Sequence, residues 1–353
     1  MLVSLTNARV DLLHAFWGIA IFFLSLSALL CLGIVFRRVL KNRKMKFREK
    51  EKIQFQAYVL DSLQISEGQI DLSSMPECHI DDITDIFLHN FQTLKGNKRA
   101  ILQDLISNSN LENRIRDRTQ KGTRGARMRA VRVLSYLNTQ NSLQVIFRSL
   151  SSEDKYIRLT AMRSLVKRDA SFFLDAIIES CLAAFPADHN LLAGIISNFR
   201  ADITEDLEGL IQTSDDPVLV AGCLETLSLI MPMETAVDFD NLMENPDKIV
   251  RAAALSLSSI TKNNAVVEPI VLGLRDTATH VKIRAAKAAN SLKRSDLTSE
   301  LFKLTDDPVL WVRYWAFRGI WVSGQSGQKL VISMRESHEM AGKVAKEMRS
   351  GYV

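Results

Sequence analysis

The sequence predicts an all-α protein, an α-solenoid of stacked helical hairpins preceded by a single transmembrane helix. Three observations lead to this fold class. The phrase "DDPV", which has the chemistry of a helix start, stands at 215–218 and returns 91 residues later at 306–309. Related stretches recur with a period of about 31 residues, and a period of this size is typical of solenoids. Gly and Pro are scarce, 15 and 7 among 353 residues, which disfavours a turn-rich β protein.

The first predicted element is a transmembrane helix at 15–36, after a short extracytoplasmic N-terminus at 1–14. The run 15–36 contains no charged residue, and about 20 apolar residues are enough to cross a bilayer as a helix. A secretory signal peptide would carry basic residues before its apolar run, whereas only Arg9 precedes this one. A buried helix of a soluble domain is the other alternative.

A basic juxtamembrane segment at 37–52 follows, with nine basic and two acidic side chains. Lys and Arg beside a span stay on the cytoplasmic side, so we expect the N-terminus outside and the remainder of the chain in the cytoplasm. Cations next to an anionic leaflet also favour contact with its headgroups. The membrane-surface residues predicted on this ground are Arg37, Arg38, Lys41, Arg43, Lys44 and Lys46.

The positive net charge of the chain belongs to this segment. The chain carries +5 in total, and the residues after 52 sum to −2. A nucleic-acid-binding body normally carries its own positive excess, so we expect no nucleic acid as a partner. The remaining charge is segregated, because 114–132 is strongly basic and 200–250 is strongly acidic. This segregation favours contact with charged partner surfaces, and an ordinary solvated helix face is the alternative.

An N-terminal helical cap is predicted at 53–116, because this part has helical patterns but lacks the 31-residue signature. The stretch "HIDDITDIFLHNFQTL" at 79–94 is its clearest helix. Asp81 and Asp82 suit the first turn, where the helix dipole favours negative charge. Ile83, Phe87 and Phe91 follow one face of the helix.

The repeats are predicted at 117–325. Asp216 and Asp307 suit helix N-caps, and Pro217 and Pro308 suit the first helical position. The copies share an apolar residue at one place, and the better copies share an Ala four residues later, which would let neighbouring helices approach closely. The shared apolar positions are Ala126, Ile157, a degraded slot near His189, Val220, Val250, Val281 and Val312, and the alanines are Ala130, Ala161, Ala254, Ala285 and Ala316.

The stretches "EDKYIRLTAMRSLVKR", "NPDKIVRAAALSLSSI", "TATHVKIRAAKAANSL" and "DDPVLWVRYWAFRGI" resemble HEAT repeats, in particular the short HEAT-like type found in phycobilisome lyases. The resemblance covers roughly 117–325. It implies a ladder of Asp–Arg contacts between repeats. We expect this ladder to be interrupted at the copy near His189 and at Ala221, where the basic residue is missing.

The order of span, basic segment and repeats also looks like membrane-anchored bacterial HEAT proteins that are often encoded near glycosyltransferases and envelope-export components. This resemblance implies a scaffold or adaptor of the bacterial inner membrane. Its partners would be other proteins of an integral inner-membrane complex for envelope or exopolysaccharide assembly and secretion, including a glycosyltransferase. The alternative is a lyase or nucleobase-processing enzyme on the same fold, which a ligand-sized pocket with acidic and aromatic side chains would favour.

The last repeat is rich in aromatic residues, and the tail at 326–353 is amphipathic. The aromatic residues form either a C-terminal cap covered by this tail or a partner-binding hot spot, in which Trp and Arg are enriched. The partner-binding candidates of the whole chain are Arg114, Arg116, Arg118, Arg124, Arg127 and Arg129 in the basic stretch, and Trp311, Tyr314, Trp315, Arg318 and Trp321 in the last repeat.

The sequence shows no catalytic constellation, since it has neither a Gly-rich phosphate loop nor a nucleophile elbow. Cys78, His79, Asp82 and His89 follow no recognised zinc spacing. The four cysteines show no paired spacing, which favours a reducing compartment. We therefore expect no enzyme activity, no cofactor, no metal and no small-molecule substrate.

Overall fold

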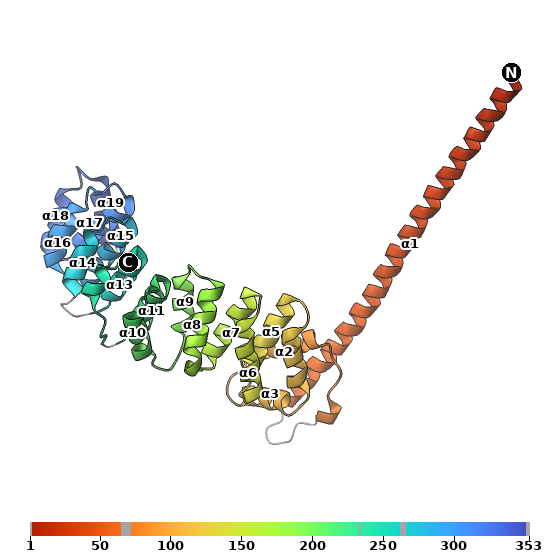
Figure 1. Cartoon of the computed structure of the whole chain (residues 1–353), viewed down its shortest axis with the longest axis horizontal. Helices are drawn as coiled ribbons and strands as arrows, with labels where there is room; N and C mark the ends of the chain where they lie inside the picture. The colour runs from red at the N-terminus through yellow and green to blue at the C-terminus, as the bar shows by residue number, and fades with distance from the viewer. Residues whose placement is uncertain (1, 65–71, 233, 262–265, 351–353) are drawn as a thin grey trace. The chain divides into compact units, whose positions relative to one another are not determined.

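The computed structural model describes residues 2–64, 72–232, 234–261 and 266–350 (Figure 1). Within these ranges every regular element is a helix, so the predicted all-α class is confirmed. The contacts of the chain divide it into two compact units, Met1–Lys121 and Gly122–Val353. They are called unit 1 and unit 2 below.

Unit 1 contains four α-helices: α1 (Leu2–Ser62), α2 (Ile80–Thr93), α3 (Asn97–Ser107) and α4 (Leu111–Gln120). The last turns of α1 belong to its core, because Phe55 and Val59 are fully buried. The ring of Phe55 meets the ring of Phe87 edge to face, with centroids 5.8 Å apart. Such aromatic pairs add to the stabilisation from buried area.

The helix expected at 79–94 is present as α2. Asp81 and Asp82 lie in its first turn, and the Nδ1 atom of His79 accepts a hydrogen bond from the Asp81 amide at 3.3 Å. The predicted apolar face is buried, with Ile83, Phe87 and Phe91 at most 2% exposed. The sequence prediction for this helix is therefore confirmed.

The predicted transmembrane helix is not confirmed. Residues 15–36 lie within α1, which continues without a break through the basic segment 37–52. Among the residues that the structure describes, no helix is long and apolar enough to cross a membrane. Most side chains before residue 29 lie outside the description, and the apolar stretch 29–36 that is described ends at Arg37.

This finding corrects the predicted location. A single-pass protein of the bacterial inner membrane, with its N-terminus outside and its repeats in the cytoplasm, is the expectation from the apolar run 15–36 and the basic residues that follow it. That inference required one helix of sufficient apolar length, and the described residues contain none. The prediction is therefore wrong, and the side chains of 1–14, expected on the outer side, lie outside the described residues.

Unit 2 is built from helices in two layers. The first layer holds the odd-numbered helices that carry the repeated signature: α5 (Arg124–Leu134), α7 (Lys155–Lys167), α9 (His189–Ile196), α11 (Pro217–Ile230), α13 (Lys248–Ser258), α15 (Thr279–Leu292) and α17 (Leu310–Val322). The second layer holds α6 (Gln140–Arg148), α8 (Leu174–Ala184), α10 (Thr204–Thr213), α12 (Phe239–Met243), α14 (Val267–Leu274), α16 (Thr298–Lys303) and α18 (Gln325–Ser333), and α19 (Glu339–Ser350) follows.

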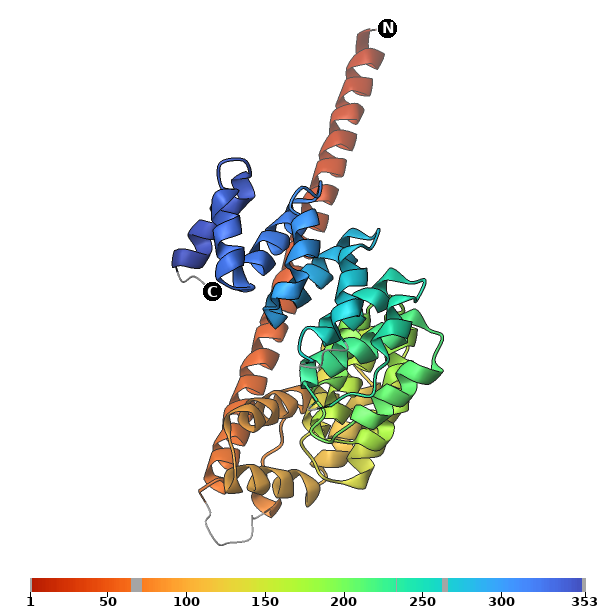
Figure 2. The same ribbon diagram turned by 90° about the vertical axis from the view of Figure 1, so that its left-hand side faces the viewer.

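The helices of the first layer pack in chain order, each against the next from α5 to α17. In the second layer α12 packs on α14, and α14 packs on α16. Figure 2 shows unit 2 progressing from yellow through green to blue in the order of the chain. This arrangement is an α-solenoid of helical pairs, in which each repeat contacts its neighbours.

The shared small and apolar residues of the repeats lie between the helices. All five aligned alanines are buried, at no more than 1% exposure. Space around them is tight, because a Cβ placed on Gly273 of α14 would lie only 2.9 Å from the Cβ of Ala285. The predicted close approach of neighbouring helices is therefore confirmed.

The two "DDPV" phrases start their helices in different ways. Asp216 is the N-cap of α11 and accepts a hydrogen bond from the Val218 amide at 2.9 Å, and Pro217 is the first helical residue, as expected. In the second copy α17 begins only at Leu310, so Pro308 lies before the helix. Asp307 still accepts a hydrogen bond from the Val309 amide at 2.9 Å.

A ladder of basic and acidic residues links successive helices of the first layer. Arg251 of α13 binds Asp276, which lies before α15, with Nε–Oδ2 and Nη2–Oδ1 distances of 2.7 and 3.1 Å. In the next repeat Lys282 of α15 binds Asp307. These carboxylates also accept backbone N–H groups at the helix starts, so each pair fixes the start of a helix to the helix before it.

Candidate binding surface

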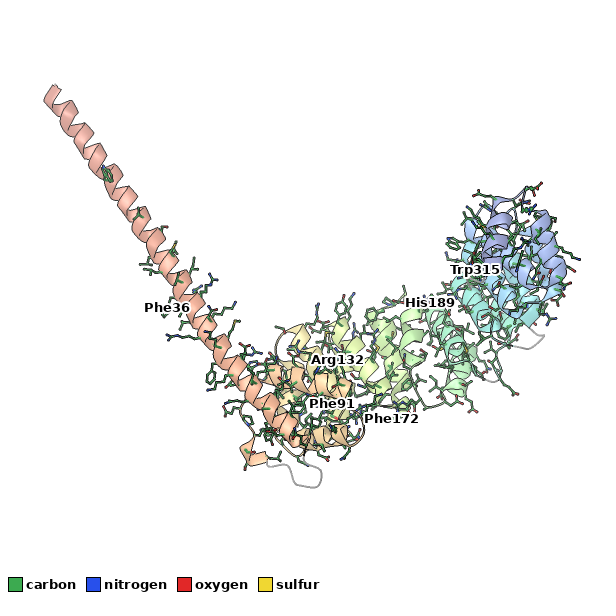
Figure 3. The ribbon with its side chains drawn as sticks, turned by 180° about the vertical axis from the view of Figure 1, so that it is seen from behind. Phe36, Phe91, Arg132, Phe172, His189 and Trp315 are labelled. Carbon is green, nitrogen blue, oxygen red and sulfur yellow. The ribbon has the colours of Figure 1, made fainter. Side chains whose placement is uncertain are left out.

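The predicted membrane-surface residues Arg37, Arg38, Lys41, Arg43, Lys44 and Lys46 all lie on α1, and all are exposed. Phe36, labelled in Figure 3, lies beside them on the same helix. A continuous helix through 37–52 places these cations on several sides of α1, because successive residues are rotated by about 100°. Contact with anionic lipid was inferred from the membrane span and loses that support.

The basic residues of α4 hold unit 1 together. Arg118 donates hydrogen bonds to both carboxylate oxygens of Asp81, at 2.8 and 2.7 Å. Arg114 donates to the Cys78 carbonyl at 2.8 Å. Arg116 donates to Asn113 within α4. Asp82 pairs with Arg48 of α1. Arg114 and Arg118, predicted to contact partners, are therefore engaged in fixing the start of α2.

The basic residues of α5 are partly engaged. Arg124 pairs with Asp154, the N-cap of α7, and this hydrogen bond is the main cause that holds the pKa of Asp154 below its ordinary value. Its guanidinium also lies 5.0 Å from the ring centroid of Tyr156. Arg127 and Arg129 are half-buried on the same helix. Arg124 extends the ladder described above to the first repeats of unit 2.

The aromatic residues of α17 divide into two groups. Phe317 and Trp321 are buried, at 0% and 8% exposure. The hydroxyl of Tyr314 lies 2.9 Å from an oxygen of Glu347 on α19, and Arg318 donates to the same oxygen at 2.9 Å. Because α18 and α19 both pack on α17, this group supports the C-terminal cap expected from the amphipathic tail.

Trp311 and Trp315 form the second group. Trp311 is 57% exposed and Trp315 is half-buried, with the ring of Tyr314 between them. The ammonium of Lys287 on α15 lies 5.0 Å from the ring centroid of Trp315, and the guanidinium of Arg318 lies 5.4 Å from it. These two tryptophans are therefore not used to fill the core.

Trp315, labelled in Figure 3, forms one wall of a groove on the first layer. We call it the Trp315 groove. Its volume is about 400 Å³. It is lined by residues of four successive odd-numbered helices: Glu225, Ser228 and Leu229 of α11, Leu255 and Ser256 of α13 with Ser259 and Ile260 after it, Arg284, Lys287, Ala288, Asn290 and Ser291 of α15, and Trp315 of α17.

The carboxylate in this groove is neutralised. Glu225 accepts a hydrogen bond from the Ser256 hydroxyl at 3.1 Å, and its Oε1 lies 3.2 Å from Nη2 of Arg284. Because Glu225 and Arg284 balance each other, the ammonium of Lys287 is the charge in the groove that no carboxylate of the lining balances. The groove carries a net positive charge beside an aromatic wall.

The groove also contains a buried acceptor without a donor. Among the described residues, the Oδ1 atom of Asn290 is buried and has no hydrogen-bond partner. Buried polar groups are hydrogen-bonded in the great majority of cases. A ligand that donates an N–H group at this point would satisfy it.

A larger hollow of about 820 Å³ lies by α10 and the chain after α11. Its acidic residue Glu208 accepts hydrogen bonds from the Thr235 hydroxyl at 2.7 Å and the Ala236 amide at 2.9 Å. The carboxylate thereby holds the chain that follows α11. No group of three or more His, Cys, Asp or Glu side chains in the described ranges could hold a metal ion.

The repeat register contains a signal for the groove that the sequence prediction did not use. The residue six positions after the shared apolar residue is Ser256 in α13, Lys287 in α15 and Arg318 in α17. All three lie at the groove or against its tryptophan. In α11 the residue six positions after the shared Val220 is Thr226, which is buried. Its neighbour Glu225 lines the groove instead.

No protein-family model matches the chain, and no curated protein matches it. Among solved structures, the complex of CpcE and CpcF of phycocyanin lyase from Nostoc sp. PCC7120 is similar, at 16% identity. The match covers 81% of this chain and 99% of that chain, with a TM-score of 0.28. The assignment of this protein to the α-solenoids rests on its own helix packing.

Proposed function

We propose that this protein is a non-catalytic adaptor that binds other proteins through unit 2, with the Trp315 groove as a docking site. The observation that carries the proposal is the position of Trp315, half-buried at the groove wall and flanked by Lys287 and Arg318. Trp and Arg are enriched among the residues that dominate binding energy at protein interfaces. Trp311, more than half exposed beside it, extends the aromatic surface.

The shape and polarity of the groove suit an extended segment of a partner. The lining spans four successive helices of one layer, so a ligand would lie across the repeats. A peptide backbone has N–H groups, and one of them could donate a hydrogen bond to Asn290 Oδ1, which has no partner in the described residues. A carboxylate of the same segment would pair with Lys287, and an apolar side chain would pack on the Trp315 ring.

Catalysis receives less support from this groove. It does combine an acidic and an aromatic residue in a ligand-sized space, the feature expected for a lyase or nucleobase-processing enzyme. However, the Glu225 carboxylate is already engaged by Arg284 and the Ser256 hydroxyl, so its contacts are with the protein itself rather than with a ligand. The adaptor role is therefore preferred.

A role in envelope or exopolysaccharide assembly is not included in the proposal. It was inferred from the order of membrane span, basic segment and repeats, and the described residues contain no helix able to span a membrane. Protein partners in general follow from the solenoid surface, which stacks repeats into an extended binding face.

Site-specific photo-crosslinking tests the proposal. A photoreactive amino acid at Ser291, exposed in the groove, is expected to give a discrete crosslinked protein in native cells. The same amino acid at Leu272, 41% exposed on α14 in the second layer, is the matched control and is expected to give none.

A second variant links the crosslink to the groove chemistry. Adding Trp315→Ala to the Ser291 probe is expected to reduce the crosslinked product at least about tenfold, as for a loss of about 1.4 kcal/mol or more in binding. Equal products at Ser291 and Leu272, or a product insensitive to Trp315→Ala, would contradict docking in the groove.

A further inference from the structure

A second hollow lies on the first layer of unit 2, at α7 and α9, which begins at the His189 labelled in Figure 3. Its volume is about 390 Å³. Its seven lining residues comprise three cations, one amide, two apolar side chains and one glycine: Arg163, Lys167, Arg200, Asn198, Val166, Ile195 and Gly194. We call it the basic hollow.

The three cations have no carboxylate among the residues that line the hollow. Arg163 and Lys167 lie one turn apart on α7, and like charges at this spacing destabilise a helix. The ion pairs of the described residues involve neither Arg163 nor Arg200. The ammonium of Lys167 lies 3.0 Å from the ring centroid of Tyr136, so Arg163 and Arg200 are the cations of the hollow that would pair with an anion from outside.

Arg200 is held at the hollow by its backbone. Asp169, whose φ of 56° is left-handed, accepts hydrogen bonds from the amides of Arg200 and Ala201 at 2.9 and 3.0 Å. These bonds, that from Ala201 first, hold the pKa of Asp169 below its ordinary value. One carboxylate oxygen is thus engaged by two backbone amides, while the Arg200 side chain remains exposed.

The floor of the hollow is apolar and open. Val166 and Ile195 are 3% and 2% exposed, and Gly194 leaves open space where a side chain would stand. Asn198 donates from Nδ2 to the Gly194 carbonyl at 2.7 Å, which leaves its amide oxygen as an acceptor. A small inorganic anion would use the cations but neither the floor nor this acceptor.

We infer that the basic hollow is a docking site for an acidic segment of a partner protein. The inference rests on the proposed protein-binding function and adds a second site with its own chemistry. Carboxylates of the segment pair with Arg163 and Arg200, an apolar side chain lies on Val166 and Ile195, and a backbone N–H donates to the amide oxygen of Asn198. Electrostatic complementarity of this kind gives specificity and fast association.

Fluorescence anisotropy of a labelled peptide tests this site on the full chain. The probe is fluorescein-labelled Glu-Glu-Glu-Leu-Glu-Glu-Glu. The ligand control is the charge-reversed peptide, in which Lys replaces every Glu. The wild type is expected to bind the glutamate peptide and not the lysine peptide, with affinity falling as salt rises.

The charge-reversed variants R163E and R200E are each expected to weaken binding at least about tenfold, and the neutral R163Q to weaken it less. R148E is the matched control, because Arg148 is exposed at the end of α6 in the other layer, and it is expected to change the affinity less than about twofold. Equal losses in R148E and R163E would overturn the inference, since binding would then follow net charge alone.

Competition distinguishes the sources of negative charge. Inorganic phosphate or a single-stranded oligonucleotide that displaces the peptide at equal charge concentration would overturn the peptide assignment in favour of a general anion site. The crosslink from Ser291 separates the two proposals, because it is expected to persist in R163E. If the wild type does not bind the glutamate peptide but still gives the Ser291 crosslink, only the proposal for the basic hollow is wrong.

Discussion

At the scale of single residues, the basic side chains of this protein divide by what they contact. Arg118, Arg124 and Arg251 each pair with an aspartate at the start of another helix. Arg163 and Arg200 instead face a hollow without carboxylates. The first group stabilises the fold, and the second group is the basis of the proposed docking of an acidic segment.

The pair of Arg251 and Asp276 predicts a pH-dependent stability. Burial alone raises the pKa of Asp276, but hydrogen bonds from Arg251 and from the Ala278 amide, with the charge of Arg251, lower it overall. A carboxyl whose pKa is lower in the folded state stabilises the fold above its unfolded pKa, near 4. That contribution is lost as the pH falls through the folded value.

Asp276→Asn is therefore expected to lower the free energy of unfolding by about 1–2 kcal/mol at pH 7, and the difference from the wild type should shrink between about pH 5 and pH 3. Urea unfolding followed by circular dichroism measures it. Glu339→Gln, which breaks the exposed pair with Lys343, is the control and should change little. A pH-independent deficit would show that Asp276 acts by packing rather than by charge.

At the scale of elements, the spacing between successive odd-numbered helices depends on small residues. Ala285 lies on α15, which packs against α13, α14 and α17, and its side chain is fully buried. Gly273 of α14 already lies at the limit of close approach to it. Protein interiors are packed at crystal-like density and tolerate little added volume. The repeated alanine is thus a requirement of the stack.

Ala285→Leu is expected to destabilise unit 2 by about 1–3 kcal/mol or more, because the added methyl groups cannot be accommodated without shifting helices. Ala183→Leu, at an exposed position of α8, keeps the chemistry and should have little effect. Thermal unfolding of both variants compares them. Similar melting temperatures would indicate that the helices separate easily, contrary to the tight packing described.

At the scale of the whole molecule, unit 2 needs a cover at the end of its stack. A solenoid has no closed core, so its terminal repeat exposes an apolar face unless other elements cover it. Here α18 and α19 pack on α17, with His338 against the ring of Phe317 at a centroid distance of 5.8 Å. The tail is therefore an integral part of the fold.

Removal of residues 325–353 is expected to expose Phe317 and Trp321 and to cost about 3 kcal/mol or more in the stability of unit 2, together with self-association. Size-exclusion chromatography and thermal unfolding measure both effects. Glu347→Ala, which loses the bonds to Tyr314 and Arg318 but keeps the cover, should show a smaller loss and remain unassociated. A stable, unassociated truncation would disprove the cap.

Several features of the fold were predictable because they depend on local chemistry or on a period. Asp216 caps α11, the aligned alanines are buried, and α2 occupies 80–93 as its apolar face indicated. The membrane span was predicted from the same kind of local pattern and was wrong, because the apolar length that the argument required is absent from the described residues. Arg114 and Arg118 were predicted to contact partners, and their bonds within unit 1 could not be seen in the sequence.

The sequence by itself determined that the chain forms a repeated stack of helices, since caps, small residues and apolar faces act over a few residues at a time. Only the tertiary structure decided which charges remain for a partner. Glu225 pairs with Arg284, and Lys287 contacts the Trp315 ring, in each case between different repeats. These contacts depend on how far each helix is rotated relative to the next. The repeat register gives Ser256, Lys287 and Arg318 equivalent positions in their helices, but it does not give that rotation, so the Trp315 groove and the basic hollow form only when the repeats are packed.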